Sequence, residues 1–89
     1  MANVIIEKLT EDEIKKRGIK NWPVWEKKVS RFDWNYDSEE QCLFLNGDVT
    51  VETKEGSYDI KAGDFVTFKQ GLSCVWNVKK RVKKHYDFK

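Results

Sequence analysis

Hydrophobic and polar residues alternate along most of this chain, as they do in strands that bury one face. Phe32, Trp34 and Tyr36 share one parity, whereas Arg31 and Asp33 between them share the other. Similar segments recur, separated by turns rich in Gly, Asp or Asn. The predicted strands cover 4–9, 31–36, 40–45, 49–53, 58–62, 65–68, 72–78 and 82–88. About eight strands so closely spaced predict an all-β sandwich or closed barrel, because closure covers the sheet edges of a small protein.

The N-terminal part carries the one helical signal. Thr10 precedes the segment Glu11–Arg17, and Glu13 stands three positions after it, which is the spacing of a capping box. Acidic residues begin this segment and basic residues end it, as the helix dipole favours. Gly18 then suits the position that terminates a helix. We therefore predict a short helix over 11–17 that decorates the barrel.

Two further segments depart from the alternation. Residues 19–28 are interpreted as an ordered loop in which Trp22 and Trp25 close one end of the barrel. The run Lys79–Lys84 holds five basic residues in six. We interpret it as a solvated turn and edge strand, since exposed lysines discourage pairing between sheet edges.

Composition narrows the classes of protein. The chain has 89 residues, which suits a single domain over 1–89 with one core. A net charge of +2, with 36% charged and 39% hydrophobic residues, is typical of a globular protein and not of a dedicated nucleic-acid binder. No apolar run approaches the roughly 18 residues of a membrane-spanning helix, and the N-terminus lacks the features of a secretory signal. We expect a cytoplasmic protein without membrane or nucleic-acid partners.

Cysteine and histidine are too sparse for the common metal sites. Cys42 and Cys74 are far apart, and neither has a second cysteine at zinc-finger spacing. The single histidine, His85, excludes sites that need two or more imidazoles. Its parity is opposite to that of Lys84, so we expect it to face outward.

The segment 34–47 resembles the first sequence motif of the cupin superfamily. Glu40 is followed by six residues and then Gly47, which matches the second half of that motif. The two histidines of the motif fall at Trp34 and Tyr36. By this resemblance the chain keeps the glutamate of the cupin ligand set and has aromatic rings in place of the two imidazoles.

The segment 63–78 resembles the second cupin motif. Gly63 and Gly71 match its glycines in identity and spacing, while Lys69 replaces its proline. Cys74 stands at the histidine position and Val78 at the final asparagine position. Glu40 is thus the one residue of the four-ligand set that this chain retains, and the metal site implied by the resemblance is degenerate.

A longer pattern resembles the small cupins of the ureidoglycine aminohydrolase-like group. It comprises W-P-x-W-E-K at 22–27, F-D-W at 32–34, E-x-C at 40–42, G-D-x-V-T-F at 63–68, G-L-x-C-x-W at 71–76 and K-H-Y at 84–86. The resemblance implies an RmlC-like jelly-roll β-barrel, often dimeric, with a site inside its mouth. A fold does not carry an activity with it, so the reaction of that group is not transferred to this chain.

Six residues are candidates for the site: Trp34, Tyr36, Glu40, Cys74, Trp76 and Lys84. A buried carboxylate is costly unless it is paired, so Glu40 indicates either a ligand-binding or acid–base residue or a structurally satisfied group. Lys84 shares a face with apolar residues; it either pairs with Glu40 or, as we favour, places its ammonium in solvent. For Cys74 a buried inert thiol is favoured over a nucleophile or metal ligand, because no base is at hand.

The aromatic candidates fill the core in part, but they also suit a small planar or cationic ligand. The first hypothesis is therefore a cupin that binds an unidentified small molecule as a homodimer, with no metal and no other cofactor, and with any catalytic residue unassigned. The second is a divalent-metal aminohydrolase-like enzyme with Glu40 and Cys74 as ligands. The third is a barrel that binds single-stranded nucleic acid through Phe65, Phe68 and the run Lys79–Lys84.

Overall fold

The computed structural model describes residues 3–89, so Met1 and Ala2 of the predicted domain lie outside the described residues. Its elements are β1 (Val4–Glu7), α1 (Glu11–Lys16), the 3-10 helix η1 (Ile19–Asn21), β2 (Val24–Lys27), β3 (Ser30–Asn35), β4 (Glu40–Thr53), β5 (Gly56–Lys61), β6 (Phe65–Phe68) and β7 (Ser73–Phe88). Within this part of the chain, no helix is long and apolar enough to span a membrane.

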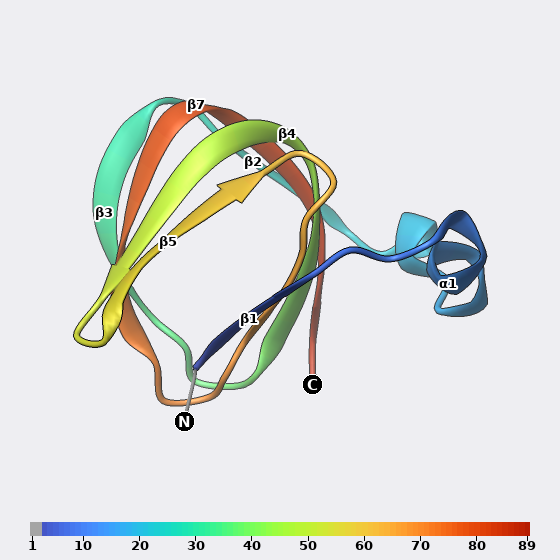
Figure 1. The fold of residues 1–89 in the computed structure, drawn as a ribbon, viewed down its shortest axis with the longest axis horizontal. Helices are drawn as coiled ribbons and strands as arrows, with labels where there is room; N and C mark the ends of the chain where they lie inside the picture. Colours follow the sequence, from blue (N-terminus) through green and yellow to red (C-terminus); the bar gives the residue numbers. More distant parts are fainter. Residues whose placement is uncertain (1–2) are drawn as a thin grey trace.

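The strands form one antiparallel sheet that curves round into a barrel, with α1 outside it (Figure 1). The main path runs in the order β1-β6-β4-β7-β2, and β5 and β3 pair with the other ends of β4 and β7. Two long strands therefore connect both halves of the barrel. The predicted all-β architecture with a short N-terminal helix is confirmed.

β4 and β7 are continuous where the sequence predicted breaks. Asn46, Gly47 and Asp48 do not form a turn between two strands, but lie at register shifts within the pairing of β4 with β7. An irregularity of this kind reverses the side-chain parity. Even-numbered Cys42 and Phe44 are buried before it, and odd-numbered Val49 and Val51 are buried after it. The bulge thus keeps one apolar face directed inward along 14 residues of strand.

Gly47 is required at this bulge because the two strands approach closely. Its φ is 117°, and a Cβ atom built there would lie 2.8 Å from the Cα of Val82. An L side chain would meet both a strained backbone conformation and a fixed neighbouring strand. The sequence pattern assigned this glycine to a turn, but in the structure it allows the close approach of β4 and β7.

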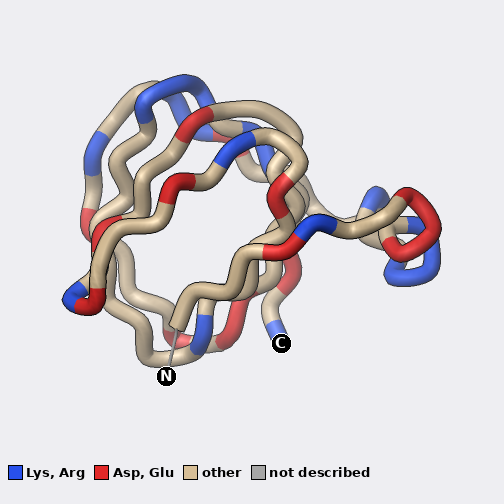
Figure 2. The backbone as a smooth tube through the Cα atoms, viewed as in Figure 1, with Lys and Arg blue, Asp and Glu red and all other residues tan. Residues whose placement is uncertain are grey.

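The basic run Lys79–Lys84 lies within β7 and does not form an edge strand, which corrects the sequence interpretation. β7 pairs with β4 on one side and with β2 and β3 on the other. Figure 2 shows that acidic residues lie among these basic ones on neighbouring strands. Lys79 lies near Asp48 and Asp59, and Arg81 lies near Glu26. The charge of the run is therefore partly balanced locally.

The N-terminal helix forms as predicted, but the ordered loop predicted after it contains regular secondary structure. Thr10 and Glu13 exchange both hydrogen bonds of the capping box, and α1 ends one residue earlier than the predicted segment. Gly18 then adopts the left-handed conformation, with φ of 64°. Residues 19–28 contain η1 and β2, because β2 pairs with the last part of β7, a partner that local sequence does not reveal.

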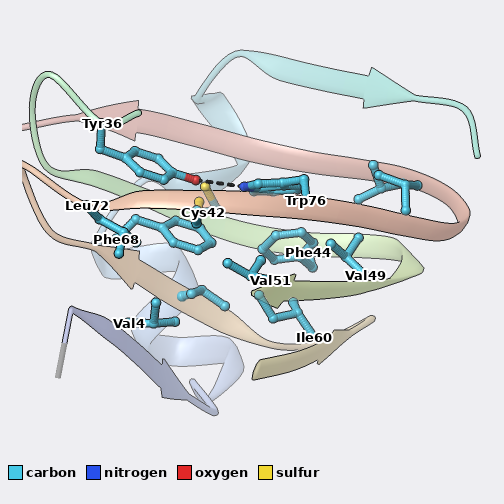
Figure 3. Close-up of a cluster of buried hydrophobic side chains, with 14 residues drawn as sticks. Val4, Tyr36, Cys42, Phe44, Val49, Val51, Ile60, Phe68, Leu72 and Trp76 are labelled. Atoms are coloured by element: carbon cyan, nitrogen blue, oxygen red, sulfur yellow. Dashed lines mark hydrogen bonds between the residues drawn. The ribbon is translucent and has the colours of Figure 1, made fainter. Parts of the chain in front are cut away.

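The core consists of two clusters. The larger one fills the barrel and is rich in aromatic and β-branched side chains (Figure 3). The smaller one joins Ile19, Leu43 and Phe65, with Trp22 packed against it. Trp25 packs against the larger cluster instead. The two tryptophans therefore do not close one end together, which corrects the prediction made for them.

Candidate functional site

A cavity of about 160 Å³ opens into the barrel between β2, β3, β4 and β7. Its lining residues are Trp25, Phe32, Trp34, Tyr36, Glu40, Trp76, Lys84, Tyr86 and Phe88. Seven of these nine side chains are aromatic, and the remaining two, Glu40 and Lys84, carry opposite charges. The structure thus brings together five of the six candidates that the sequence identified.

Cys74, the sixth candidate, does not line this cavity. It packs in the same buried cluster as Trp76, and its Sγ lies 3.7 Å from the carbonyl oxygen of Trp34. Burial raises the pKa of the Cys74 thiol to about 11. The thiol is therefore protonated near neutral pH.

Glu40 and Lys84 form a buried ion pair at the inner end of the cavity. Nζ of Lys84 donates a hydrogen bond to Oε2 of Glu40 at 3.0 Å, and both side chains are only 5% exposed. The prediction that the Lys84 ammonium lies in solvent is wrong. The pair forms because β4 and β7 are neighbours in the sheet and both residues have inward parity. In this setting each charge offsets the desolvation of the other.

Cys42 completes a triangle with this pair. Its Sγ lies 3.2 Å from Nζ of Lys84 and 3.3 Å from Oε2 of Glu40, with the thiol donating to the carboxylate. Burial raises the pKa of the Cys42 thiol, although Lys84 acts in the opposite direction. A protonated thiol can accept from the ammonium and donate to the carboxylate, so Cys42 satisfies both charged groups.

Aromatic rings surround the ammonium on its remaining sides. Nζ of Lys84 lies 4.8 Å from the ring centroid of Trp76, 5.0 Å from that of Trp25 and 5.8 Å from that of Phe44. Indole and phenyl faces attract cations through their quadrupoles, most strongly where water is excluded. The ion pair is therefore stabilised by rings as well as by its carboxylate.

Tyr36 and Trp76 are held by a hydrogen bond between their side chains, drawn in Figure 3. Nε1 of Trp76 donates to the hydroxyl oxygen of Tyr36 at 3.2 Å, and the Tyr36 ring stacks on Phe68 at 4.9 Å. Burial, followed by the charge of Glu40, raises the pKa of Tyr36 above its ordinary value. The hydroxyl therefore keeps its proton and can donate it.

The mouth of the cavity exposes aromatic surface. Trp34 is 46% exposed and Phe88 is 52% exposed, although both line the cavity. Each has an aromatic neighbour: Trp34 meets Tyr36 edge-on at 6.4 Å, and Phe88 meets Tyr86 at 5.7 Å. The rim is thus an exposed apolar surface that continues into the buried interior.

Four lining residues were not among the sequence candidates: Trp25, Phe32, Tyr86 and Phe88. The parity of Phe32 with Trp34, and of Tyr86 and Phe88 with Lys84, was the signal that could have found three of them. Trp25 had no such signal, because its place depends on the pairing of β2 with β7, where it lies opposite Lys84.

The residues of the cavity do not fit the metal site that the cupin resemblance implies. Within residues 3–89, no three His, Cys, Asp or Glu side chains gather closely enough to hold a metal ion. His85 lies elsewhere, with Nδ1 3.0 Å from the carbonyl oxygen of Trp22. Oε2 of Glu40 is engaged by the ammonium and the thiol. A metal cation next to this carboxylate would be repelled by the ammonium of Lys84 or would have to displace it.

Two features invoked for nucleic-acid binding have other roles in this fold. Phe65 and Phe68 are completely buried, so neither ring offers a face on which a base could stack. Lys84 is buried in the cavity, and Lys79 and Arg81 have acidic neighbours. The geometry therefore favours the interior of the barrel over its surface as the functional site.

Comparison with known proteins agrees with this architecture. The model of the EutQ-like cupin domain family matches residues 14–86. A crystal structure of a DUF861 family protein from Thermotoga maritima is 48% identical, with a TM-score of 0.94, and the match covers 97% of this chain and 99% of that one. A search of curated proteins finds none that matches.

Two more distant structures share the fold. A DUF861 family protein of unknown function from Pseudomonas syringae pv. tomato is 25% identical, with a TM-score of 0.67, over 74% of this chain and 29% of that one. The EutQ protein of Clostridium difficile is 17% identical, with a TM-score of 0.68, over 73% of this chain and 52% of that one. The barrel with its interior cavity is thus a cupin, and the chain belongs to the EutQ-like cupin domain family.

Proposed function

We propose that this cupin binds a small molecule in the barrel cavity without a metal ion. The observation that carries the proposal is the continuity of exposed aromatic surface at the rim with a buried ion pair at the inner end. Concave, mostly apolar sites with a few convergent polar groups are typical of ligand pockets. A ligand seated there would cover the rings of Trp34 and Phe88, which are otherwise in water.

The chain provides its own reporter for a binding experiment. Three of the four tryptophans line the cavity, whereas Trp22 packs in the smaller cluster. Fluorescence titration against a library of small molecules should give saturable changes that Trp34→Ala weakens or abolishes. Trp22→Phe is the matched control and should keep both the affinity and most of the signal change. If no compound binds, or if binding is indifferent to Trp34→Ala, the proposal is wrong.

The narrower grouping with ureidoglycine aminohydrolase-like cupins stays a prediction from the motifs at 22–27 and 63–76. A metal-dependent hydrolase would need at least three protein ligands, and the described cavity supplies Glu40 alone from the cupin set. We therefore favour binding over metal-dependent hydrolysis.

We also propose a cytoplasmic homodimer. β1 ends the main path of the sheet, and Ile5 and Ile6 on it are each 38% exposed. A second copy of the chain would cover this apolar edge, and symmetric pairing is the commonest way to do so. The small core of an 89-residue domain adds to the reason for association.

A further inference from the structure

We infer that the ligand of this cavity is an uncharged molecule of about one ring, carrying both a hydrogen-bond donor and an acceptor. The inference rests on the proposed function and specifies its ligand class. It follows from three features: the position of Lys84, the polar atoms of Glu40 and Tyr36 that have unused hydrogen-bonding capacity, and the size of the cavity.

The first feature is that Lys84 fills the place in which the cavity would hold a cation. Three aromatic rings within 5.8 Å and a carboxylate at 3.0 Å surround its ammonium. This combination of rings and a carboxylate is the usual recognition site for ligand ammonium groups. Here the protein supplies the ammonium itself, so a cationic ligand would meet a like charge in the same place.

The second feature is the set of polar atoms that remains. Oε2 of Glu40 accepts from both Lys84 and Cys42, whereas Oε1 has no hydrogen-bond partner among residues 3–89. The hydroxyl of Tyr36 accepts from Trp76, and its own proton has no acceptor in that part of the chain. The cavity thus offers one acceptor and one donor to a ligand, and an anionic ligand would meet the negative charge of Glu40.

The third feature is size. A buried apolar cavity of about 150 Å³ holds a molecule of benzene. The cavity here is about 160 Å³ and has seven aromatic side chains in its lining. These dimensions suit one ring with a small substituent, and the rings at the mouth allow stacking or edge contacts with it.

The experiment uses a series of single-ring compounds that differ in one polar group: benzamide, toluene, benzoate and benzylammonium. Benzamide can accept from the Tyr36 hydroxyl and donate to Glu40, so it should bind about tenfold more tightly than either charged compound. Tyr36→Phe should weaken the binding of benzamide by about fivefold and leave the affinity for toluene unchanged. Tryptophan fluorescence and chemical-shift changes report the binding.

A gain of binding tests the role of Lys84 directly. Lys84→Met removes the internal cation, so benzylammonium should bind at least about tenfold more tightly to this variant than to the wild type. Lys83→Met, on the opposite face of β7, is the matched control and should leave every affinity unchanged. The double variant Glu40→Gln/Lys84→Met keeps the cavity uncharged and should lose the gain. Circular dichroism establishes that each variant is folded.

The outcomes separate the inference from the proposed function. Tighter binding of benzylammonium or benzoate than of benzamide to the wild type overturns the inference, and the binding function stands. The absence of any gain in folded Lys84→Met overturns it as well. If the whole series fails while the library yields larger ligands, the inference is again wrong and the function stands. If neither the series nor the library binds, both are wrong.

Discussion

Lys84 and Glu40 are 44 positions apart in the sequence, yet their side chains form an ion pair of 3.0 Å inside the barrel. The carboxylate is the residue that the cupin pattern retains, and the ammonium comes from the strand beside it. The positive charge next to this glutamate thus belongs to the chain itself. This relationship accounts for the absence of metal-ligand geometry in the described cavity and for its expected preference for uncharged ligands.

The ion pair predicts a strongly non-additive mutant cycle. Lys84→Met and Glu40→Gln should each lower the free energy of unfolding by about 3–5 kcal/mol, because each weakens or removes one partner of a buried pair. The double variant should lie within about 1.5 kcal/mol of the wild type. Urea denaturation measures all three. Lys83→Met is the control, with a change below about 0.5 kcal/mol. Additive losses in the double variant would show that the two charges do not depend on each other.

The buried thiols predict a loss of stability in alkaline solution. The folded pKa of Cys74 is raised to about 11, and burial also raises that of Cys42. An unfolded thiol ionises near pH 8.5, so the folded state holds protons that the unfolded state releases. Each thiol's contribution to the free energy of unfolding is complete below that pH. It falls by about 1.4 kcal/mol for each pH unit as the pH rises toward the folded pKa.

Urea denaturation from pH 8 to 11 tests this linkage. Between about pH 9 and 11 the unfolding free energy of Cys74→Ala should fall less steeply with pH than that of the wild type, because one of the two thiols is gone. The Tyr36 phenol, whose folded pKa is also raised by burial, adds to the slope above about pH 10, where unfolded tyrosine ionises. An unfolding free energy that stays constant to pH 11 would contradict the protonated thiols described above.

Gly47→Ala should destabilise the protein by about 2–3 kcal/mol, since the new Cβ meets the Cα of Val82 at 2.8 Å and the backbone has a φ of 117°. Gly56→Ala is the matched control, because its φ of 142° is also strained but no atom lies within 4 Å of the position that its new Cβ would take. Thermal denaturation should show the larger loss for Gly47→Ala. Equal losses would mean that the close approach of β4 and β7 contributes nothing.

The proposed homodimer predicts twice the chain mass of 10.6 kDa in light scattering at micromolar concentration. Ile6→Lys should shift the mass toward the monomer, because it places a charge on the apolar edge of β1. Val29→Lys alters an exposed apolar residue outside that strand and serves as the control. A monomeric mass for the wild type at high micromolar concentration would refute the dimer.

Much of the fold follows from period-two patterns in the sequence. The parity around Trp76 and around Lys84 placed two predicted strands, which the structure joins as β7, and the capping box of Thr10 and Glu13 placed the short helix. The continuity of β4 was not predictable, because the Asn46-Gly47-Asp48 segment has turn composition and only its pairing with β7 makes it a bulge. Local residues do not encode that partner.

The residues of the site were predictable where strand parity determines which side chains face inward. Five candidates line the cavity because their strands alternate regularly. Cys74 has inward parity as well, but its side chain packs in the buried cluster, with its thiol against the carbonyl oxygen of Trp34. Trp25 could not be predicted, since it reaches Lys84 through β2, which the sequence presented as a loop. The ion pair required two strands to be neighbours, a fact that alternation alone does not supply.

The most direct test of a cavity that binds its ligand without metal is a titration of benzamide into the wild-type protein before and after treatment with EDTA. Tryptophan fluorescence follows binding, and elemental analysis verifies that no transition metal remains. The account predicts the same affinity in both samples, within about twofold. Loss of binding after EDTA, with recovery on addition of one equivalent of Zn²⁺ or Mn²⁺, would contradict it.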